Sequence, residues 1–318
     1  MTALVSLDEI RAAAARVSSV ARVTPLIDVS RQAEQSLLLK CESLQPSGAF
    51  KIRGAYNMVA QLTAEERRRG VITYSSGNHG QAMALAAREL GAPAVVVMPK
   101  TASRVKVEGA RSFGAEVIFE GTTSVDRRVR AEREADARGL TMVPPFDHPW
   151  IIAGQGTAGL EILEQRPDVG SVLVPIGGGG LIAGIAAAIK LTSPEVQVIG
   201  VEPEGAAAMK ASVDAGHVVT LDKAETIADG LMPVRPGDLT FAHVRQFVDR
   251  IVTVTDLQII DAMLWLFSNA KIVAEPSGAA TVAAALTAKP RLRGPVVAVV
   301  SGGNIAMDRL EELRQSAR

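Results

Sequence analysis

The chain has 318 residues, and its 34 lysine and arginine residues balance 34 aspartate and glutamate residues, so the formal net charge is zero. This balance gives no support to nucleic acid or an acidic membrane surface as a partner. The single cysteine, Cys41, excludes an internal disulfide framework, and the four histidines are too scattered in the sequence to form a metal-ligand cluster. The length suits one large or two medium domains.

The sequence has neither the pattern of a secretion signal nor that of a membrane-spanning segment. Its first residues lack the basic start and apolar block of a secretion signal. No uninterrupted apolar run is long enough to cross a bilayer. We therefore expect a protein of the reducing cytoplasm.

The first part of the chain alternates between helix and strand patterns. Ser6, followed three residues later by Glu9, forms a capping box that predicts a helix over 7–18. Apolar and alanine-rich stretches then predict further elements. We expect strands at 37–42, 70–76, 92–99 and 115–120, and helices at 79–90 and 103–114.

The second part continues the same alternation. We expect a strand and glycine loop over 171–180, a helix over 181–191, a strand over 196–203 and a strand that runs into a loop over 294–304. Short apolar strands that alternate with helices predict parallel sheets covered by helices on both faces. The fold class is therefore α/β, with two lobes and with ligand groups at the carboxyl ends of the strands.

Four consecutive glycines, Gly177, Gly178, Gly179 and Gly180, follow an apolar strand and precede a helix. Backbone N–H groups in such a loop can surround an anion, and the start of the helix adds positive potential. A tight turn would also use glycine, but four in a row exceed what a turn needs. The spacing does not match the dinucleotide fingerprint or the P-loop, so we expect a phosphate that belongs to neither NAD nor ATP.

Two more polar clusters follow predicted strands. The sequence SSGNHG over 75–80 offers hydroxyl, amide and backbone N–H groups, although a helix N-cap alone would explain them. The sequence SGGN over 301–304 repeats this arrangement. Because the carboxyl ends of parallel strands meet at one edge of a sheet, these clusters are candidates for one site.

Lys51 lies in the sequence SGAFKIRGA, between Phe50 and the predicted start of a helix. Most lysines are solvated on a helix face, and Lys51 taken alone fits that description. Burial would lower the pKa of its amine and make it available for Schiff-base chemistry. A reactive lysine together with a phosphate cup meets the requirements of a pyridoxal phosphate enzyme.

In this order, the segments SGAFKIRGA, SSGNHGQA, VPIGGGGLIAG, EPSGA and VSGGN resemble those of fold-type II pyridoxal phosphate enzymes, and specifically the serine/threonine dehydratase and serine racemase group. The resemblance extends over essentially the whole chain. It implies a two-lobed fold like that of the tryptophan synthase β subunit. The large cofactor-binding domain would comprise 1–69 and 148–318, and the small domain 70–147.

The resemblance also implies roles for individual residues toward pyridoxal 5'-phosphate. Lys51 would bind the cofactor as a Schiff base and move the substrate Cα proton, and Phe50 would pack beside the cofactor ring. The remaining contacts would come from Asn78 to the 3-oxygen, Gly177, Gly178, Gly179, Gly180 and Leu181 to the phosphate, and Ser301 to the pyridine nitrogen. The substrate carboxylate would lie by Ser75, Ser76, Gly77 and His79.

The implied activity is that of an ammonia-lyase, which converts serine, threonine or 3-hydroxyaspartate to a 2-oxo acid and ammonia. Ser76, on the cofactor face opposite Lys51, could exchange the Cα proton from that side, so serine racemase is the alternative. A noncatalytic protein that binds a phosphate ligand is an alternative of another class. In that case Lys51 would be idle.

The resemblance leaves the metal site of this group incomplete. Racemases of the group bind a divalent cation such as magnesium or manganese through a Glu, a backbone carbonyl and an Asp. Glu202 and Ala206 match the first two, but Ala208 stands at the expected Asp position. Losing one of two carboxylates weakens a site for a hard cation. By analogy we expect a homodimer with a small amino acid as its substrate.

Overall fold

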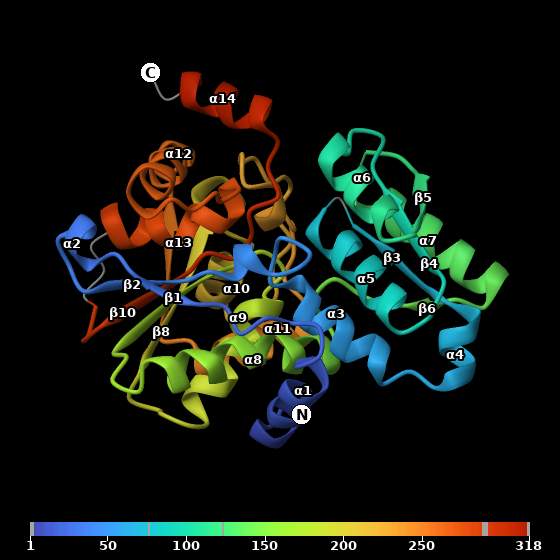
Figure 1. Cartoon of the computed structure of the whole chain (residues 1–318), viewed down its shortest axis with the longest axis horizontal. Helices are drawn as coiled ribbons and strands as arrows, with labels where there is room; N and C mark the ends of the chain where they lie inside the picture. Colours follow the sequence, from blue (N-terminus) through green and yellow to red (C-terminus); the bar gives the residue numbers. More distant parts are fainter. Residues whose placement is uncertain (1–2, 76, 123, 288–291, 317–318) are drawn as a thin grey trace.

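The computed structural model describes residues 3–75, 77–122, 124–287 and 292–316. Two sheets, each flanked by helices, form two lobes that lie side by side (Figure 1). One sheet has six strands and the other has four. This arrangement confirms the predicted α/β class with two lobes. Among the described helices, none combines the length and apolar character needed to cross a membrane.

The larger sheet has the strand order β1-β2-β10-β7-β8-β9. Its strands are β1 (Leu26–Asp28), β2 (Leu37–Lys40), β7 (Ser171–Pro175), β8 (Gln197–Pro203), β9 (Arg250–Val254) and β10 (Val296–Val299). Neighbouring strands are parallel except β1 and β2, which are antiparallel. This edge departs from the expected parallel pattern because the connection between β1 and β2 is too short for a crossover.

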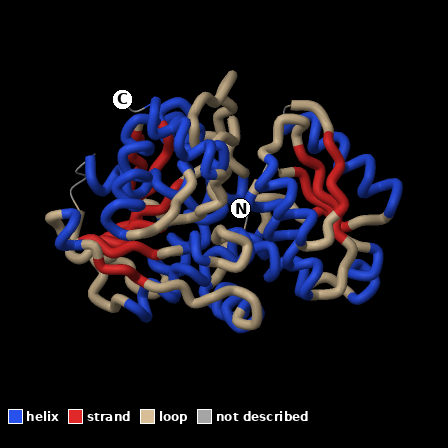
Figure 2. The backbone as a smooth tube through the Cα atoms, turned by 45° about the horizontal axis from the view of Figure 1, so that its top comes forward, coloured by secondary structure: helices blue, strands red, loops and turns tan. Residues whose placement is uncertain are grey.

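The smaller sheet has the strand order β5-β4-β3-β6, and all its neighbouring strands are parallel. Its strands are β3 (Val71–Tyr74), β4 (Ala94–Met98), β5 (Glu116–Phe119) and β6 (Thr141–Met142). Figure 2 shows the two sheets well separated, with helices and loops between them. The strands expected from the sequence are therefore present, each within a few residues of its predicted bounds.

Helices occupy most of the remaining described chain. They are α1 (Leu7–Val17), α2 (Ser30–Ala33), α3 (Lys51–Ala60), α4 (Ala64–Arg69), α5 (Asn78–Glu89), α6 (Arg104–Ser112), α7 (Ser124–Arg138), α8 (Pro149–Gln165), α9 (Gly180–Lys190), α10 (Ala208–Ala215), α11 (Asp238–Phe247), α12 (Asp256–Trp265), α13 (Pro276–Thr287) and α14 (Met307–Ser316). Short 3-10 turns form η1 (Glu42–Leu44), η2 (Glu204–Ala206) and η3 (Asp229–Leu231), and a π turn forms η4 (Leu266–Ala270). The predicted capping box of Ser6 and Glu9 begins α1.

Strand β7 shows why the central strands are apolar along their whole length. Val172 and Val174 pack into a cluster with α8 and α9, whereas Leu173 packs into a second cluster with α12 and α13 on the other face. Successive side chains of a strand point to opposite faces, so a strand covered on both faces needs apolar residues at every position. The layers of helix, sheet and helix follow from this pattern.

Helix α3 connects the two lobes. Its residues Ile52, Ala55 and Met58 pack into the apolar cluster of the smaller sheet, together with Val71 and Val96. The same helix begins at a segment that is bound to the loop after β10 of the larger sheet. The division into a large domain of 1–69 and 148–318 and a small domain of 70–147 stays a prediction.

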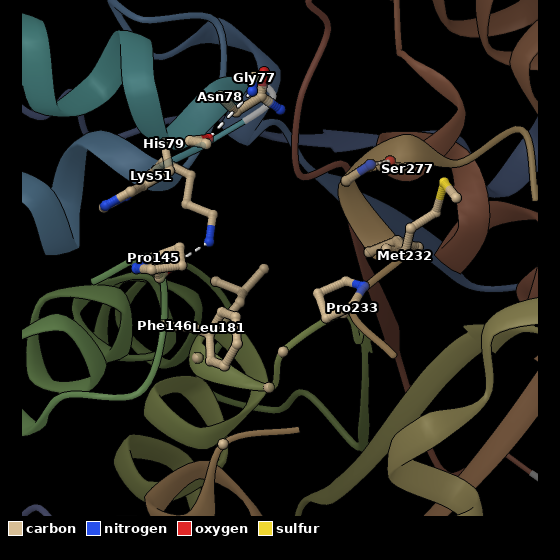
Figure 3. A pocket seen from close by; sticks show the side chains of 18 of the residues that line it. Lys51, Gly77, Asn78, His79, Pro145, Phe146, Leu181, Met232, Pro233 and Ser277 are labelled. Carbon is tan, nitrogen blue, oxygen red and sulfur yellow. Dashed lines mark hydrogen bonds between the residues drawn. The ribbon is translucent and has the colours of Figure 1, made fainter. Parts of the chain in front are cut away.

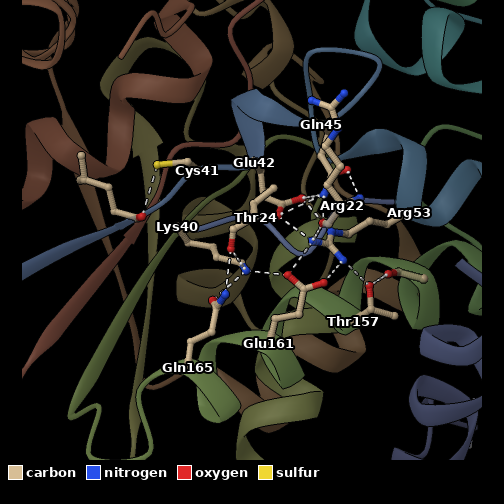
Figure 4. A network of polar contacts seen from close by, with 12 residues as sticks. Arg22, Thr24, Lys40, Cys41, Glu42, Gln45, Arg53, Thr157, Glu161 and Gln165 are labelled. Atoms are coloured by element: carbon tan, nitrogen blue, oxygen red, sulfur yellow. Dashed lines mark hydrogen bonds and ion pairs between the residues drawn. The ribbon is translucent and has the colours of Figure 1, made fainter. Parts of the chain in front are cut away.

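A buried ionic network fixes the first turn of α3 (Figure 4). The Arg53 guanidinium, which is fully buried, donates to the Glu42 carboxylate through Nε (2.7 Å) and Nη2 (2.8 Å). It also donates to Glu161 on α8 through Nη1 at 2.6 Å, and Lys40 on β2 donates to the same carboxylate at 2.5 Å. Burial alone raises the pKa of Glu42, but the charge and hydrogen bonds of Arg53, together with Lys40 and Thr24, outweigh burial and hold that pKa below its ordinary value.

We expect the substitution Arg53→Met to lower the free energy of unfolding by about 3–5 kcal/mol, because it leaves buried carboxylates without their cation. Urea unfolding followed by the fluorescence of Trp150 and Trp265 measures this loss. Arg104→Met is the matched control, since Arg104 is exposed and pairs with Glu108 on the same helix. Equal stabilities of the two variants would contradict the structural role of the network.

Candidate active site

A cavity of about 690 Å³ lies where the carboxyl ends of β3, β7 and β10 approach one another. Both lobes contribute to its lining, as a close view shows (Figure 3). All three clusters singled out in the sequence reach this cavity, as does Lys51. The residues with predicted cofactor or substrate roles that line it are Phe50, Lys51, Ser75, Gly77, Asn78, His79, Gly177, Gly178, Gly179, Gly180, Leu181 and Ser301. Ser76 lies outside the described residues.

Two motif segments are bound directly to each other at the edge of the cavity. The Phe50 N–H donates to the Ser301 carbonyl at 3.0 Å, and Ala49 forms a β-bridge with Gly302. Gly48 has a φ of +72°, and a Cβ added there would lie 2.1 Å from Asn304 Oδ1. A side chain at position 48 would therefore be strained and would collide. This pairing places Phe50 and Lys51 beside Ser301.

Lys51 is the first residue of α3, and its side chain extends along the cavity. Its Nζ donates to the Pro145 carbonyl at 2.7 Å and lies 5.0 Å from the centre of the Phe50 ring. Burial disfavours the charged ammonium and lowers the pKa of Lys51 to about 8. No carboxylate forms an ion pair with Lys51 within the described part of the chain. This amine has the setting of a nucleophile or a base.

The glycine loop joins β7 to α9. Gly179 precedes α9 with a φ of +95°, a conformation that favours glycine. Within the described chain, the backbone N–H groups of Gly177 to Gly180 donate to no protein acceptor. Unpaired N–H groups at the start of an eleven-residue helix form a site for an anion.

Phe146 connects the glycine loop with Lys51. A Cβ added at Gly178 would lie 2.3 Å from the Phe146 ring, and one added at Gly180 would lie 3.0 Å from Phe146 Cβ. Phe146 follows Pro145, whose carbonyl accepts the hydrogen bond from Lys51. The segment 145–146 therefore holds the amine and the loop next to each other, a role that no local sequence pattern indicates.

The loop after β3 leads into α5, which begins at Asn78. The Ser75 hydroxyl accepts a hydrogen bond from the Gly77 N–H at 3.2 Å. A Cβ added at Gly77 would lie 2.8 Å from Lys106 Cδ, so the backbone of the loop contacts the Lys106 side chain. The start of α5 thereby offers N–H groups and positive potential to the cavity.

His79 is buried and neutral. Its Nε2 lies 3.1 Å from the Val143 carbonyl, which can only accept, so Nε2 carries the proton. Burial and the nearby charge of Lys51 lower the pKa of His79 to about 3. Its Nδ1 has no partner within the described chain. His79 is therefore not an acid that titrates near neutral pH.

The cavity also contains a charged group of three residues, Lys106, Asp229 and Glu275, that was not expected there from the sequence. Lys106 on α6 forms an ion pair with Asp229 of η3 and lies 3.8 Å from Glu275 Oε2. Burial raises the pKa of Glu275 to about 7, although the charge of Lys106 opposes this. No short sequence pattern connects these residues, since they come from distant segments.

The candidate metal residues Glu202, Ala206 and Ala208 are not among those that line this cavity. The Glu202 carboxylate accepts hydrogen bonds from the N–H groups of Met209 and Lys210, each at 2.8 Å, at the start of α10. Burial raises the pKa of Glu202 to about 7. Ala206 and Ala208, a few residues further along the chain, are also buried, and neither has a carboxylate to offer a metal. The described residues contain no group of three acidic, histidine or cysteine side chains suited to a metal.

Three comparisons agree on one family. Residues 17–302 match the family described as pyridoxal-phosphate dependent enzyme. The L-threonine ammonia-lyase of Thermotoga maritima is 45% identical over 314 residues, which cover 98% of this chain and 78% of that protein. The serine racemase of Schizosaccharomyces pombe is 38% identical over 310 residues, with 96% of both chains covered. The structure of maize serine racemase is 37% identical and has a TM-score of 0.94, and the match covers 99% of this chain and 98% of that one.

We expect chemical modification of Lys51 to follow its lowered pKa. In ligand-free protein, the neutral amine forms as the pH rises through about 8, so reductive methylation at Lys51 should rise with a midpoint near that pH. Mass spectrometry of peptides measures the extent of reaction at this residue. A midpoint near the ordinary value for a lysine would contradict the buried setting of the amine.

Proposed function

The chain belongs to the family of pyridoxal-phosphate dependent enzymes, and from this premise we propose that it converts a small hydroxy amino acid to a 2-oxo acid and ammonia. The substrate would be serine, threonine or 3-hydroxyaspartate. The Cα proton and the β-hydroxyl leave as water, and water then replaces the nitrogen, so ammonia and the 2-oxo acid are the net products. The likeness to the L-threonine ammonia-lyase over 98% of this chain supports the proposal.

The residues that line the cavity suit the parts of pyridoxal phosphate. The aldehyde requires an amine, which Lys51 offers with no ion-pair partner among the described residues. The phosphate requires hydrogen-bond donors, and the N–H groups of Gly177 to Gly180 have no protein acceptor within the described chain. The ring requires an apolar neighbour and polar contacts at its edges, for which Phe50, Asn78 and Ser301 line the same cavity.

One observation carries the proposal. A desolvated lysine amine and a loop of unpaired N–H groups line a single cavity, and the segment 145–146 contacts both. A protein that bound only a phosphate ligand would need the loop but would have no use for the buried amine. The position of Lys51 therefore favours an enzyme over a noncatalytic binding protein.

The bound cofactor would supply an electron-withdrawing ring that makes the substrate Cα–H acidic. Lys51 Nζ would hold the cofactor and, once released from it, would remove the Cα proton. With a pKa of about 8, about a tenth of this amine is neutral at pH 7, far more than for a solvated lysine, and the neutral form is the one that acts as a base. The loop at Ser75, Ser76 and Gly77, with the start of α5, would bind the substrate carboxylate.

Ser301 would lie at the ring nitrogen. Its hydroxyl is buried and donates to the Ser277 carbonyl at 3.4 Å, so it brings no charge to the site. A hydroxyl stabilises a protonated ring nitrogen much less than a carboxylate does. Chemistry in which the β-hydroxyl leaves as the Cα proton is removed suits this uncharged partner, because negative charge does not have to persist on the substrate.

Serine racemase is the second candidate function. The serine racemases of maize and Schizosaccharomyces pombe are similar to almost the whole chain. In this function Ser76 would exchange the Cα proton on the face opposite Lys51. Our proposal also includes a cytoplasmic homodimer without a nucleic-acid partner, and the zero net charge supports the last point.

The activity is tested by supplying the purified, cofactor-bound protein with L-serine, D-serine, L-threonine and both 3-hydroxyaspartate diastereomers. We expect oxo-acid release from at least one of them, and a loss of at least about 100-fold in Lys51→Ala. Lys210→Ala is the control, because Lys210 is partly exposed and its ammonium pairs with Asp214 on the same helix. Ser76→Ala should abolish any D-serine formation from L-serine and spare elimination.

Failure of all five compounds to yield an oxo acid would contradict the proposed lyase. Full activity in Lys51→Ala would contradict the role of the amine. D-serine formation without oxo acid would favour the racemase.

A further inference from the structure

Polar side chains from both lobes form a continuous chain of contacts along one wall of the cavity. Asn304 Nδ2 donates to the Ser47 carbonyl at 2.9 Å and to Asn78 Oδ1 at 3.0 Å. Asn78 Nδ2 in turn donates to Glu275 Oε1. The other oxygen of Glu275 lies 3.8 Å from Lys106 Nζ.

The direction of each hydrogen bond in this series follows from the one between Asn304 and the Ser47 carbonyl. The Ser47 carbonyl can only accept, so the nitrogen of Asn304 must face it. The second N–H of that nitrogen donates to Asn78, which requires Asn78 to present its oxygen to Asn304. The Asn78 nitrogen then faces Glu275, and one of its two N–H groups remains for a ligand. Asn78 lines the cavity, so this remaining donor is available there.

Close packing around Glu275 holds its carboxylate next to the Asn78 amide. Glu275 is 2% exposed, and its Oε2 has no hydrogen-bond partner within the described chain. A Cβ added at Gly302 would lie 2.3 Å from Glu275 Oε1 and 3.1 Å from Asn78 Nδ2. Only glycine at position 302 therefore leaves room for the contact between Glu275 and Asn78.

We propose that Asn304 and Glu275 are positioning residues that hold the Asn78 amide in one orientation, with an N–H group presented to the 3-oxygen of the cofactor ring. This inference rests on the proposed function, in which Asn78 contacts that oxygen. A freely rotating amide would present its carbonyl to the ring oxygen part of the time, and two acceptors repel each other. The two neighbours remove this alternative before the cofactor binds.

The Lys106 ion pair offers a competing role for Glu275. Lys106 comes from the smaller lobe, and both Asp229 and Glu275 come from the larger one, so these charges could simply hold the lobes together. Asp229 shares the contact with Lys106, and its described hydrogen bonds and ion pairs include none with Asn78. The substitution Asp229→Asn therefore separates the two roles.

The experiment compares wild-type holoenzyme with Glu275→Ala, Glu275→Gln, Asn304→Ala and Asp229→Asn. It measures the dissociation constant of pyridoxal phosphate and the wavelength of its bound absorbance band, which responds to charge and hydrogen bonding at the ring oxygen. We expect Glu275→Ala and Asn304→Ala each to weaken binding about tenfold or more and to shift the band. Glu275→Gln keeps an acceptor for Asn78 and should restore most of the affinity. Asp229→Asn leaves the contact between Glu275 and Asn78 in place and should lose much less affinity than Glu275→Ala.

Wild-type affinity and an unshifted band in Glu275→Ala and Asn304→Ala would overturn the inference. So would an equal loss in Asp229→Asn and Glu275→Ala, because that result assigns Glu275 to the contact between the lobes. Should Glu275→Ala fail to fold, Asn304→Ala decides, since it removes two hydrogen bonds of a half-buried side chain, to Ser47 and to Asn78, and leaves no buried charge unpaired. A wild-type protein without any cofactor band would instead defeat the proposed function itself.

Discussion

The site depends on one constraint, which is that the amine of Lys51 is buried away from water. Lys51 extends from the first turn of α3 into the cavity, and within the described chain the hydrogen-bond partner of its amine is a backbone carbonyl. An ammonium in this position loses hydration without gaining an anion, which is why burial favours its neutral form. Contacts of the surrounding structure must therefore offset the free energy that burial of this amine costs.

Two features on either side of Lys51 supply that support. Before it, the backbone of residues 48–50 is bound to the loop after β10, so the amine is fixed relative to Ser301. After it, Arg53 anchors the same helical turn to Glu42 and Glu161. A lysine held by both neighbours has little freedom to move toward solvent. The buried ionic network therefore acts on the site without contacting the cavity.

Local patterns in the sequence predicted most of the strands, the capped first helix and the glycine loop, because each depends on neighbouring residues, whereas β1, β6 and β9 were not expected. The role of Phe146 could not be predicted, since its contact with Gly178 joins segments far apart in the chain. The same is true of Lys106, Asp229 and Glu275, which meet only when the lobes pack together. Single-residue roles came from the resemblance to a family, and Ser76 lies outside the described residues.

The most direct test of the central claim locates the covalent bond itself. The cofactor-bound protein is reduced with borohydride, digested with trypsin and examined by mass spectrometry. We expect a phosphopyridoxyl group on Lys51, in a peptide that spans residues 41–53 because trypsin does not cut after a modified lysine. Modification of a different lysine, such as Lys106, or of none, would contradict the account.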